Sequence, residues 1–392
     1  MEMTKYKLGD LCKEFHSGKG ILAAEISDSG RYPVYGGNGL RGYTDRYNQD
    51  GSYLIIGRQG AYCGNVRYNV GKAFLTEHAI VGQTKNEHNA IYLAFKLSLM
   101  NLAQFQGQSA QPGLSVDTLS KIELLMPSRY EQDKIAKILV DLDDKIALNK
   151  KMNQKLEAMA KRLYDYWFVQ YDFPDKNGHP YKTTGGPMTY NPTLKREIPV
   201  GWEVSNICPL MEILPGGTPS KAKPEYWNGE IPFFGPTDYC GDVFQLSTEE
   251  LITENGLNNC ASALYPPKTI FITARGSVGK LIVCGKPMAM NQSCYALKPF
   301  DLEKYEYLFY LTKQLIEQLK KKGSGSVFKS INTLDIEQSF LSIAPNEIID
   351  LYCKKVKSIF ERIKSNTVEI AKLTALRDKL LPLLMNGQVV VG

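Results

Sequence analysis

The fold is decided by the stretch from Glu131 to Gln170, which reads EQDKIAKILVDLDDKIALNKKMNQKLEAMAKRLYDYWFVQ. It contains neither glycine nor proline, and its apolar residues recur at alternating intervals of three and four, as in helices that pack along one seam. A helix of this length would extend about 60 Å, far beyond an average globular helix. We therefore predict a spacer or dimerisation rod whose seam is formed by Ile135, Ile138, Leu142, Lys145, Asn149, Met152, Leu156, Met159, Leu163 and Tyr166.

A second seam of the same kind is predicted to begin near Asn346 and to end at Pro382 and Asn386-Gly387. Since both seams lie in one chain, the economical solution is that the two helices pack antiparallel, with Asn149 and Asn366 setting the register. The alternative is that each helix pairs with a separate protein. The second seam contains Val356, Ile359, Ile363, Asn366, Ile370, Leu373, Arg377, Leu380 and Leu384. The residues expected to pack the pair are Ile135, Ile138, Leu142, Asn149, Leu156, Leu163, Ile359, Ile363, Asn366, Ile370, Leu373 and Leu380.

Each helix follows a glycine-rich half with β-strand character, because the chain runs through the same plan twice. Gly60 and Gly276 are matched at an offset of 216, and each lies in a turn that follows an apolar strand. We expect an α/β (α+β) fold in which two β-rich domains are separated by a pair of long antiparallel coiled-coil helices, with a pseudo-twofold internal repeat. The matched segments are Ile55–Gly64 with Phe271–Gly279, Phe74–His78 with Ala289–Ser293, and Thr118-Leu119 with Thr333-Leu334 at an offset of 215.

Composition sets the predicted boundaries. A length of 392 residues suits two domains of ordinary size. The first domain is assigned to residues 1–130, ending near Pro127-Ser128, and the first long helix to residues 131–172. A link rich in proline and glycine leads into the second domain, and together they are assigned to residues 173–345. The second helix and a C-terminal tail take residues 346–392.

Charge and cysteine usage exclude several classes of protein. The 47 Lys and Arg residues exceed the 41 Asp and Glu residues, which permits a polyanionic partner without requiring one. The eight cysteines form no CxxC pair, and four histidines complete no zinc-ligand spacing, so no metal site is predicted and the thiols are expected to be reduced. No apolar run is long enough to span a membrane, and no secretory leader is recognisable. We expect a cytoplasmic protein with no membrane association.

No catalytic site is predicted. Pro266-Pro267 is followed by Lys268 and so lacks the Asp/Asn-Pro-Pro-Tyr/Phe motif of an adenine methyltransferase. Residues 274–281 resemble a phosphate-binding loop only in part, because Ala274 replaces the first glycine and Leu281 the hydroxyl residue. Glu77-His78 could form an acid/base pair, but the matching positions in the second half are Gln292-Ser293. A catalytic pair would not survive that replacement, whereas two surfaces that bind different sequences would differ in this way.

Several motifs are similar to those of one known family. They are Glu131-Gln132-x-x-Ile135-Ala136-x-Ile138-Leu139, Leu163-x-x-x-Trp167-Phe168-Val169, Leu380-Leu381-Pro382-x-Leu384-Met385-x-Gly387 and Ile198-Pro199-x-Gly201-Trp202-Glu203. Together they resemble the specificity subunit of type I restriction-modification enzymes. The resemblance covers essentially the whole chain and its order of domain, helix, domain, helix. One departure is the loop at residues 108–113, whose second copy, residues 323–328, has a different sequence.

The resemblance implies two target-recognition domains on a non-catalytic subunit that reads a bipartite, asymmetric double-stranded DNA target. It implies two adenine methyltransferase subunits as partners, with restriction/translocase subunits in the full complex. S-adenosylmethionine, ATP and Mg would bind to those partners and not to this chain. Two other hypotheses are a nuclease or methyltransferase fragment, which would act on DNA alone, and a coiled-coil adaptor, which would not bind DNA.

Side chains that contact DNA are expected to gather at matched points of the repeat. Arginine and lysine read guanine, asparagine and glutamine read adenine, and lysine, arginine and serine bind phosphates. The turns at Arg58 and Arg275 are taken as matched points, as are the clusters at Thr76–His78 and Asn291-Gln292. For each residue the alternative is a solvated surface side chain. The candidates are Lys19, Arg41, Tyr43, Arg58, Gln59, Lys72, Thr76, Glu77, His78, Gln108, Ser109 and Gln111 in the first half, and Thr218, Ser220, Lys221, Lys223, Arg275, Ser277, Lys280, Asn291, Gln292, Ser324, Ser326 and Lys329 in the second.

Overall fold

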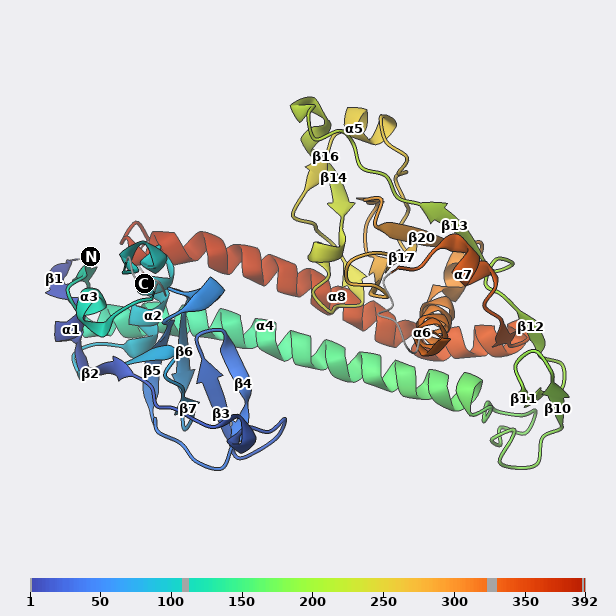
Figure 1. Ribbon diagram of the computed structural model, residues 1–392, viewed down its shortest axis with the longest axis horizontal. Helices are drawn as coiled ribbons and strands as arrows, with labels where there is room; N and C mark the ends of the chain where they lie inside the picture. Colours follow the sequence, from blue (N-terminus) through green and yellow to red (C-terminus); the bar gives the residue numbers. More distant parts are fainter. Residues whose placement is uncertain (1, 108–112, 323–329, 390, 392) are drawn as a thin grey trace. The chain divides into compact units, whose positions relative to one another are not determined.

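The chain forms two compact units in a computed structural model that describes residues 2–107, 113–322, 330–389 and 391 (Figure 1). The first unit comprises residues 1–146 and 372–392, and the second comprises residues 147–371. Helices α4 (Arg129–Tyr164) and α8 (Asn346–Met385) each pass from one unit into the other. The contact-based division therefore gives each unit half of the helix pair, whereas the sequence-based boundaries treat the helices as separate segments.

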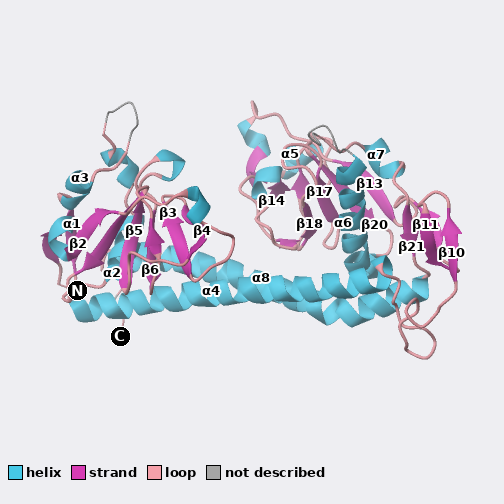
Figure 2. Cartoon of the chain, turned by 60° about the horizontal axis from the view of Figure 1, so that its bottom comes forward, coloured by secondary structure: helices cyan, strands magenta, loops and turns pink. Residues whose placement is uncertain are grey.

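The first unit is built on a four-stranded antiparallel sheet in the order β2-β8-β5-β6 (Figure 2). Leu54 and Ile56 of β5 face a core that includes α2, and Tyr53 and Ile55 face a second core against a smaller sheet, β4-β3-β7. Burial on both faces explains why β5 is an uninterrupted apolar run. The elements are β1 (Thr4–Lys7), α1 (Leu8–Leu11), β2 (Cys12–Ser17), β3 (Tyr32–Gly36), β4 (Gly39–Thr44), β5 (Ser52–Gly57), β6 (Val66–Val70), β7 (Phe74–Leu75), β8 (Ala79–Thr84), α2 (Ala90–Ser98), α3 (Val116–Ser120) and β9 (Glu123–Met126).

The second unit repeats this arrangement with additions. Its main sheet has the order β13-β20-β17-β18-β15, and a smaller sheet has the order β16-β14-β19. Helix α6 takes the place of α2 and is longer, with Leu308, Leu311 and Leu315 in the core. The elements are β10 (Met188–Asn191), β11 (Arg196–Pro199), β12 (Glu203–Ser205), β13 (Met211–Pro215), β14 (Trp227–Phe234), β15 (Phe244–Gln245), β16 (Leu251–Ile252), α5 (Glu254–Asn258), β17 (Ile270–Thr273), β18 (Leu281–Cys284), β19 (Ala289–Met290), β20 (Cys294–Pro299), α6 (Tyr305–Lys322), α7 (Thr333–Glu337) and β21 (Leu341–Ile343).

The strand pairing confirms the internal repeat. Antiparallel β2-β8-β5-β6 corresponds to β13-β20-β17-β18, the parallel pair β3-β7 to β14-β19, and the pair β1-β9 to β12-β21. The long helices begin at Arg129 and at Asn346, so each follows the last strand of its half, β9 or β21. The expected two-domain fold with long helices is therefore confirmed.

The structure shifts the predicted match of Thr118-Leu119 with Thr333-Leu334 by two residues. The short helices α3 and α7 are capped by the side chains of Ser115 and Asn332, which accept hydrogen bonds from backbone N–H groups. Aligning these two caps makes buried Leu119 correspond to buried Ile336. The predicted match of Leu119 with Leu334 is wrong, because the side chain of Leu334 is 61% exposed. Burial decides the alignment where the two sequences share few identities.

The long helices pack antiparallel within each unit. In the first unit the Arg377 guanidinium donates a hydrogen bond of 2.7 Å to Oδ1 of Asp143. In the second unit the Tyr352 hydroxyl donates a hydrogen bond of 3.1 Å to the backbone oxygen of Ala160. Partner numbers on α8 rise as those on α4 fall, which is the signature of antiparallel packing. The expectation that the two helices of this chain pair with each other is confirmed.

Several residues predicted to form the buried seam of α4 are exposed, and in each case the next residue along the helix is buried instead. Lys145 is exposed, and the side chains of Met159 and Tyr166 are 60% and 37% exposed. The buried line continues from Asn149 through Asn153 instead, because alternate heptad positions lie one residue later than predicted. A shift of one residue turns a side chain by about 100° around the helix axis. The buried residues of α4 and the following π-helical turn (Asp165–Val169) are Gln132, Ile135, Ala136, Leu139, Ile146, Asn149, Asn153, Ala160, Tyr164, Trp167 and Phe168.

The predicted packing residues lie in or beside the two cores. Ile135, Asn149, Ile363 and Asn366 are buried. The partly buried residues are Ile138, Leu142, Leu156, Leu163, Ile359, Ile370, Leu373 and Leu380. Asn149 and Asn366, which were expected to set the register, each form a hydrogen bond across the seam, but not with each other. The Asn366 amide donates to Asn153 Oδ1 at 2.9 Å, and the Asn149 amide donates to Glu369 Oε2 at 3.0 Å.

Candidate nucleic-acid interface

In the first unit, loops from the ends of several strands meet at one place. The backbone N–H of Arg58, after β5, donates to the carbonyl of His78, after β7, at 2.9 Å. The His78 ring lies 3.3 Å from Gln59 Oε1 and 3.3 Å from Glu77 Oε1. Thr76 N–H donates to the Tyr35 carbonyl at the end of β3, also at 2.9 Å. Short strands that end together thus bring polar residues from distant parts of the sequence side by side.

Glycines allow these loops to approach closely. A Cβ atom on Gly37 would lie 2.9 Å from the carbonyl oxygen of His78, closer than real Cβ contacts. A Cβ atom on Gly36 would lie 2.9 Å from Cδ of Arg41, so the arginine side chain lies across this turn. Lys19 joins the group through its N–H, which donates to the Leu75 carbonyl at 2.9 Å. We call this the first strand-end surface: Lys19, Gly36-Gly37, Arg41, Arg58-Gln59 and Thr76–His78.

The second unit builds an equivalent surface with the same hydrogen bonds. Asn291 N–H donates to the Phe234 carbonyl at 2.9 Å, and Ala274 N–H donates to the Ser293 carbonyl at 2.7 Å. The Thr218 hydroxyl donates to the side-chain carbonyl of Gln292. We call this the second strand-end surface: Gly217-Thr218, Gly235, Ala274–Ser277 and Asn291–Ser293. The predicted match of Thr76–His78 with Asn291–Ser293 is confirmed by the parallel pairs Leu75 with Tyr35 and Met290 with Phe234.

The two arginines of the matched turns are not equivalent. Gln59 forms a bridge with Gly113 and Arg275 forms one with Ser330, so Gln59 corresponds to Arg275. Arg58 then corresponds to Ala274, which is buried. The turns are therefore matched at the predicted offset of 216, but their two arginines lie one residue apart in this alignment. Gly60 and Gly276 remain matched, with φ of 77° and 75°, because both turns need a left-handed residue there.

Four positively charged side chains of these surfaces have no acidic partner among the described residues. Within the ranges that the structure describes, Lys19, Arg41, Arg58 and Arg275 form no ion pair, and all but the half-buried Arg58 are exposed. Two polar atoms of the first surface, the Thr76 hydroxyl and Glu77 Oε2, are buried without a hydrogen-bond partner among the described residues. Unpaired positive charge beside unsatisfied polar groups suits an anionic ligand with hydrogen-bonding edges.

Several other predicted contacts lie elsewhere or are occupied. Lys72 follows Val70, at the end of the β5-β6 hairpin opposite to Arg58, and its ammonium lies 4.4 Å from the centre of the Tyr47 ring. Tyr43 pairs through its backbone with Ser27, away from the Gly36-Gly37 turn. Five predicted DNA contacts of the second unit instead interact with other residues of that unit. The interactions are Lys221 with Glu250 at 2.6 Å, Lys223 with the Tyr226 hydroxyl at 2.9 Å, the Ser220 carbonyl with Trp227 Nε1 at 3.2 Å, the Ser277 carbonyl with the Thr273 hydroxyl at 2.5 Å, and Lys280 over the Tyr239 ring at 5.2 Å.

Six predicted contacts, Gln108, Ser109, Gln111, Ser324, Ser326 and Lys329, lie outside the described residues. The residues that follow these two segments, Gly113 and Ser330, bridge to Gln59 and Arg275. Each segment therefore leads directly into a strand-end surface.

Sequence reasoning missed Arg67. It lies on β6 opposite Ile55, and its guanidinium occupies the space where a side chain on Gly39 would lie. The φ of 100° at Gly39 and the open face of that residue let the arginine cross the β3-β4 turn. Because β6 reads Val66-Arg67-Tyr68-Asn69-Val70, Arg67 fits the ordinary polar face of an alternating strand, and no signal in the sequence set it apart.

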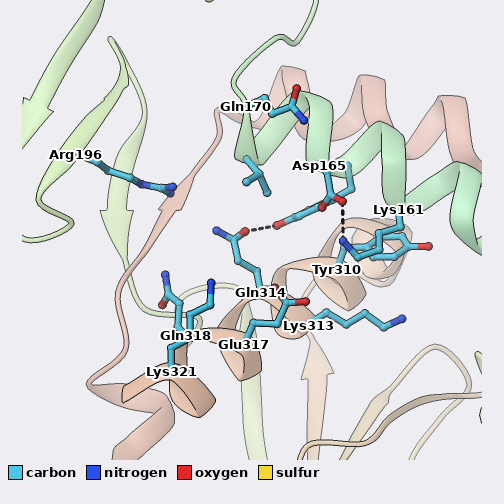
Figure 3. A pocket seen from close by; sticks show the side chains of 12 residues that line it. Lys161, Asp165, Gln170, Arg196, Tyr310, Lys313, Gln314, Glu317, Gln318 and Lys321 are labelled. Atoms are coloured by element: carbon cyan, nitrogen blue, oxygen red, sulfur yellow. Dashed lines mark hydrogen bonds and ion pairs between the residues drawn. The ribbon is translucent and has the colours of Figure 1, made fainter. Parts of the chain in front are cut away.

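A separate pocket of about 410 Å³ lies in the second unit between the end of α4, β11 and α6 (Figure 3). Gln314 points toward the Tyr164 hydroxyl, which donates to its Oε1 at 2.9 Å, and Lys161 pairs with Asp165 at 2.6 Å. None of the residues predicted to contact DNA lines this pocket.

Burial shifts the pKa of several thiols and of one carboxyl group. Burial raises the pKa of the thiols of Cys12, Cys294 and Cys353 to about 12, so these thiols stay protonated and unreactive. Burial raises the pKa of Glu306, on α6, to about 7. No group of three or more histidine, cysteine or acidic side chains within the described ranges is arranged to hold a metal ion. No helix in the described part of the chain is long and apolar enough to cross a membrane.

The fold and the two strand-end surfaces agree with the protein family whose model matches this sequence. The family model described as type I restriction modification DNA specificity domain matches residues 1–158 and residues 199–375. The chain belongs to this family. Each matched segment contains one strand-end surface, so the specificity domain occurs once per half of the chain. The resemblance read from the motifs is confirmed, and with it the assignment to the non-catalytic specificity subunits of type I restriction-modification systems.

Relatives support the family over most of this specificity subunit, and a solved structure shares its fold. The type I restriction enzyme HindI specificity subunit of Haemophilus influenzae is 28% identical over 327 residues, covering 71% of each chain. The MjaIX specificity subunit of Methanocaldococcus jannaschii is 30% identical over 305 residues, covering 76% of this chain and 68% of the relative. The crystal structure of an S subunit from M. genitalium has a TM-score of 0.64 at 16% identity, covering 98% of this chain and 96% of that one, which shows a shared fold.

Proposed function

We propose that this specificity subunit reads a bipartite, asymmetric double-stranded DNA target, with one half-site for each strand-end surface. The observation that carries the proposal is that one set of backbone hydrogen bonds presents different side chains in the two units. Thr76–His78 is replaced by Asn291–Ser293, and Gln59 by Arg275. Equal frameworks with different donors and acceptors are suited to two different base sequences.

The side chains of the two strand-end surfaces can form hydrogen bonds with base edges and ion pairs with phosphates. The amides of Asn291 and Gln292 match the donor and acceptor pair of adenine, and the exposed guanidinium of Arg275 matches guanine. In the first unit, Gln59 supplies an amide, while Lys19 and Arg41 supply unpaired charge for phosphates. Phosphate contacts would fix the register of each unit on the duplex, and the polar side chains would select bases.

We further propose that two methyltransferase subunits bind the helix pair, and that restriction/translocase subunits join them in the full complex. Exposed apolar side chains at equivalent positions of the repeat support two copies of one partner. The side chain of Met159 on α4 is 60% exposed, and that of Leu376, at the equivalent position of α8, is 46% exposed. Two equivalent apolar faces suit two identical protein partners better than one. S-adenosylmethionine, ATP and Mg would bind to those partners, and the assembly would work in the cytoplasm, where its DNA lies.

The test is to map methylated adenines in cells that carry this chain with its methyltransferase subunit. The proposal expects one sequence of two different half-sites separated by an unread spacer, and loss of all methylation when the chain is absent. A palindromic target, or methylation that does not depend on the chain, would contradict it. Incubation of the purified chain alone with DNA and labelled S-adenosylmethionine should give no labelled DNA, which separates this function from that of a methyltransferase fragment.

A further inference from the structure

The last turn of α6 lies against the turn between β17 and β18. A Cβ atom on Gly279, in that turn, would lie 2.7 Å from Cγ2 of Ile316 and 3.1 Å from Cε of Lys320. The Lys320 ammonium nitrogen would lie 3.4 Å from the same point. Gly279 also has a φ of 77°, which favours glycine. The bare glycine therefore makes room for the aliphatic part of Lys320 and brings its ammonium to the edge of the turn.

At the equivalent place in the first unit, the nearest described atoms belong to Leu102 and Ala103 and not to a cation. Gly64 occupies the position of Gly279, since its N–H donates to Gly57 as that of Gly279 donates to Thr273, both at 2.8 Å. A Cβ atom on Gly64 would meet the backbone of Leu102 and Ala103, the nearest at 2.6 Å. The backbone of Leu102 and Ala103 covers the turn in the first unit, whereas a lysine side chain covers it in the second.

The charge of Lys320 is available to a ligand. Its side chain is exposed, and it forms no ion pair among the described residues. Arg275, at the start of the same turn, is exposed and also unpaired within that part of the chain. Glu317, one helical turn earlier, lines the pocket drawn in Figure 3 together with Lys321, on another side of α6. The β17-β18 turn thus carries an arginine and a lysine from two different elements.

We propose that Lys320 binds a backbone phosphate of duplex DNA and has no counterpart in the first unit. This inference rests on the proposed DNA-reading function and adds a residue to the second strand-end surface. The ammonium is a compact point charge at the rim of the turn, which suits a phosphate oxygen better than the two-atom edge of a base. Lys320 therefore adds one sequence-independent contact to those that hold the second half-site.

The experiment compares Lys320→Gln with Lys321→Gln in the full chain bound to its methyltransferase subunits. Both variants remove one positive charge from the last turn of α6, but only the side chain of Lys320 lies against the β17-β18 turn. Fluorescence anisotropy would measure binding to a duplex with the mapped target and to a scrambled duplex, at several KCl concentrations. For Lys320→Gln the slope of log affinity against log salt should fall by about 0.9 on both duplexes. Its loss of affinity between 50 and 200 mM KCl should then be about 3.5-fold smaller than that of the parent.

Two further results support the inference: Lys321→Gln keeps the parent slope, and Lys320→Arg restores it, because either cation can bind a phosphate. Equal slopes for the parent and Lys320→Gln would overturn it. Equal losses in the two glutamine variants would also overturn it, as would a changed base preference in Lys320→Gln, which would make Lys320 a base reader. If the parent complex itself shows no preference for the mapped target, the proposed function fails instead.

Discussion

The side-chain amide of Asn366 donates a hydrogen bond of 2.9 Å to Oδ1 of Asn153 inside the seam between α4 and α8. Asn153 in turn donates to the Thr367 hydroxyl at 3.3 Å, so a polar layer interrupts the apolar packing of the second unit. Asn153 and Asn366 are almost completely buried, with 7% and 1% of their surfaces exposed. Buried amide pairs of this kind select one register of a helix pair, because any shift leaves an amide without a partner.

Loss of one amide should destabilise the helix pair. Asn153→Ala leaves the buried Asn366 amide without its acceptor and should lower the free energy of unfolding by about 1–3 kcal/mol. Urea denaturation followed by circular dichroism would measure the change. Gln154→Ala, an exposed amide at the next position, is the control and should stay within about 0.5 kcal/mol of the parent. Equal effects of the two substitutions would show that the amide pair does not contribute.

The alignment of the two turns makes a prediction about base choice. Since Gln59 corresponds to Arg275, Gln59→Arg should shift the preference at one position of the first half-site from adenine toward guanine. Arg275→Ala should weaken one position of the second half-site by about 1–3 kcal/mol and leave the first unchanged. Mapping methylated adenines in cells would measure both, with Lys72→Ala, at the far end of the hairpin, as the control. Uniform weakening of all sequences would identify both residues as phosphate contacts.

Lengthening the helices should lengthen the unread spacer. Four residues add about 6 Å to a helix, close to two base pairs of duplex. We expect insertion of four residues after Asn149 in α4 and four after Asn366 in α8 to keep both half-site sequences and lengthen the spacer. Both points lie close to the boundaries between the two units, at residues 146–147 and 371–372. Mapping methylated adenines is the readout, and an unchanged spacer would mean that the helices do not set the spacing.

Glu306 should make stability depend on pH. Burial raises its pKa from 4.5 to about 7, so the folded chain binds more protons than the unfolded chain between these values. Its stabilising contribution is complete below about pH 4.5 and is lost as the pH rises through 7. Glu306→Gln, which stays neutral, should therefore be more stable than the parent at pH 8, by up to about 3 kcal/mol. Thermal unfolding at pH 5 and pH 8 would measure this, with exposed Glu317→Gln as the control for net charge; a parent stability that does not fall between these values would contradict it.

The sequence by itself determined the order of elements and the repeat. The α4 helix was expected from about residue 131 and begins at Arg129, and the α8 helix begins at Asn346 as expected. The α4 helix follows from a long periodic run without glycine or proline, and the α8 helix from a second periodic run that continues through Pro382 to Met385, shortly before Gly387. The matched loops after β7 and β19 were also found from sequence, because the strands that lead into them are apolar in both halves.

Tertiary packing alone decided which face of α4 is buried and how the short helices α3 and α7 align. Apolar residues lie on both candidate lines of α4, so size favoured Met159, yet Ala160 is buried and Met159 is exposed. A small residue is needed there because Tyr352 packs against it and its hydroxyl donates to the Ala160 carbonyl. In the short helices, the burial of Leu119 in one core and of Ile336 in the other sets the alignment. Such contacts join residues far apart in the chain, and no local pattern of residue types encodes them.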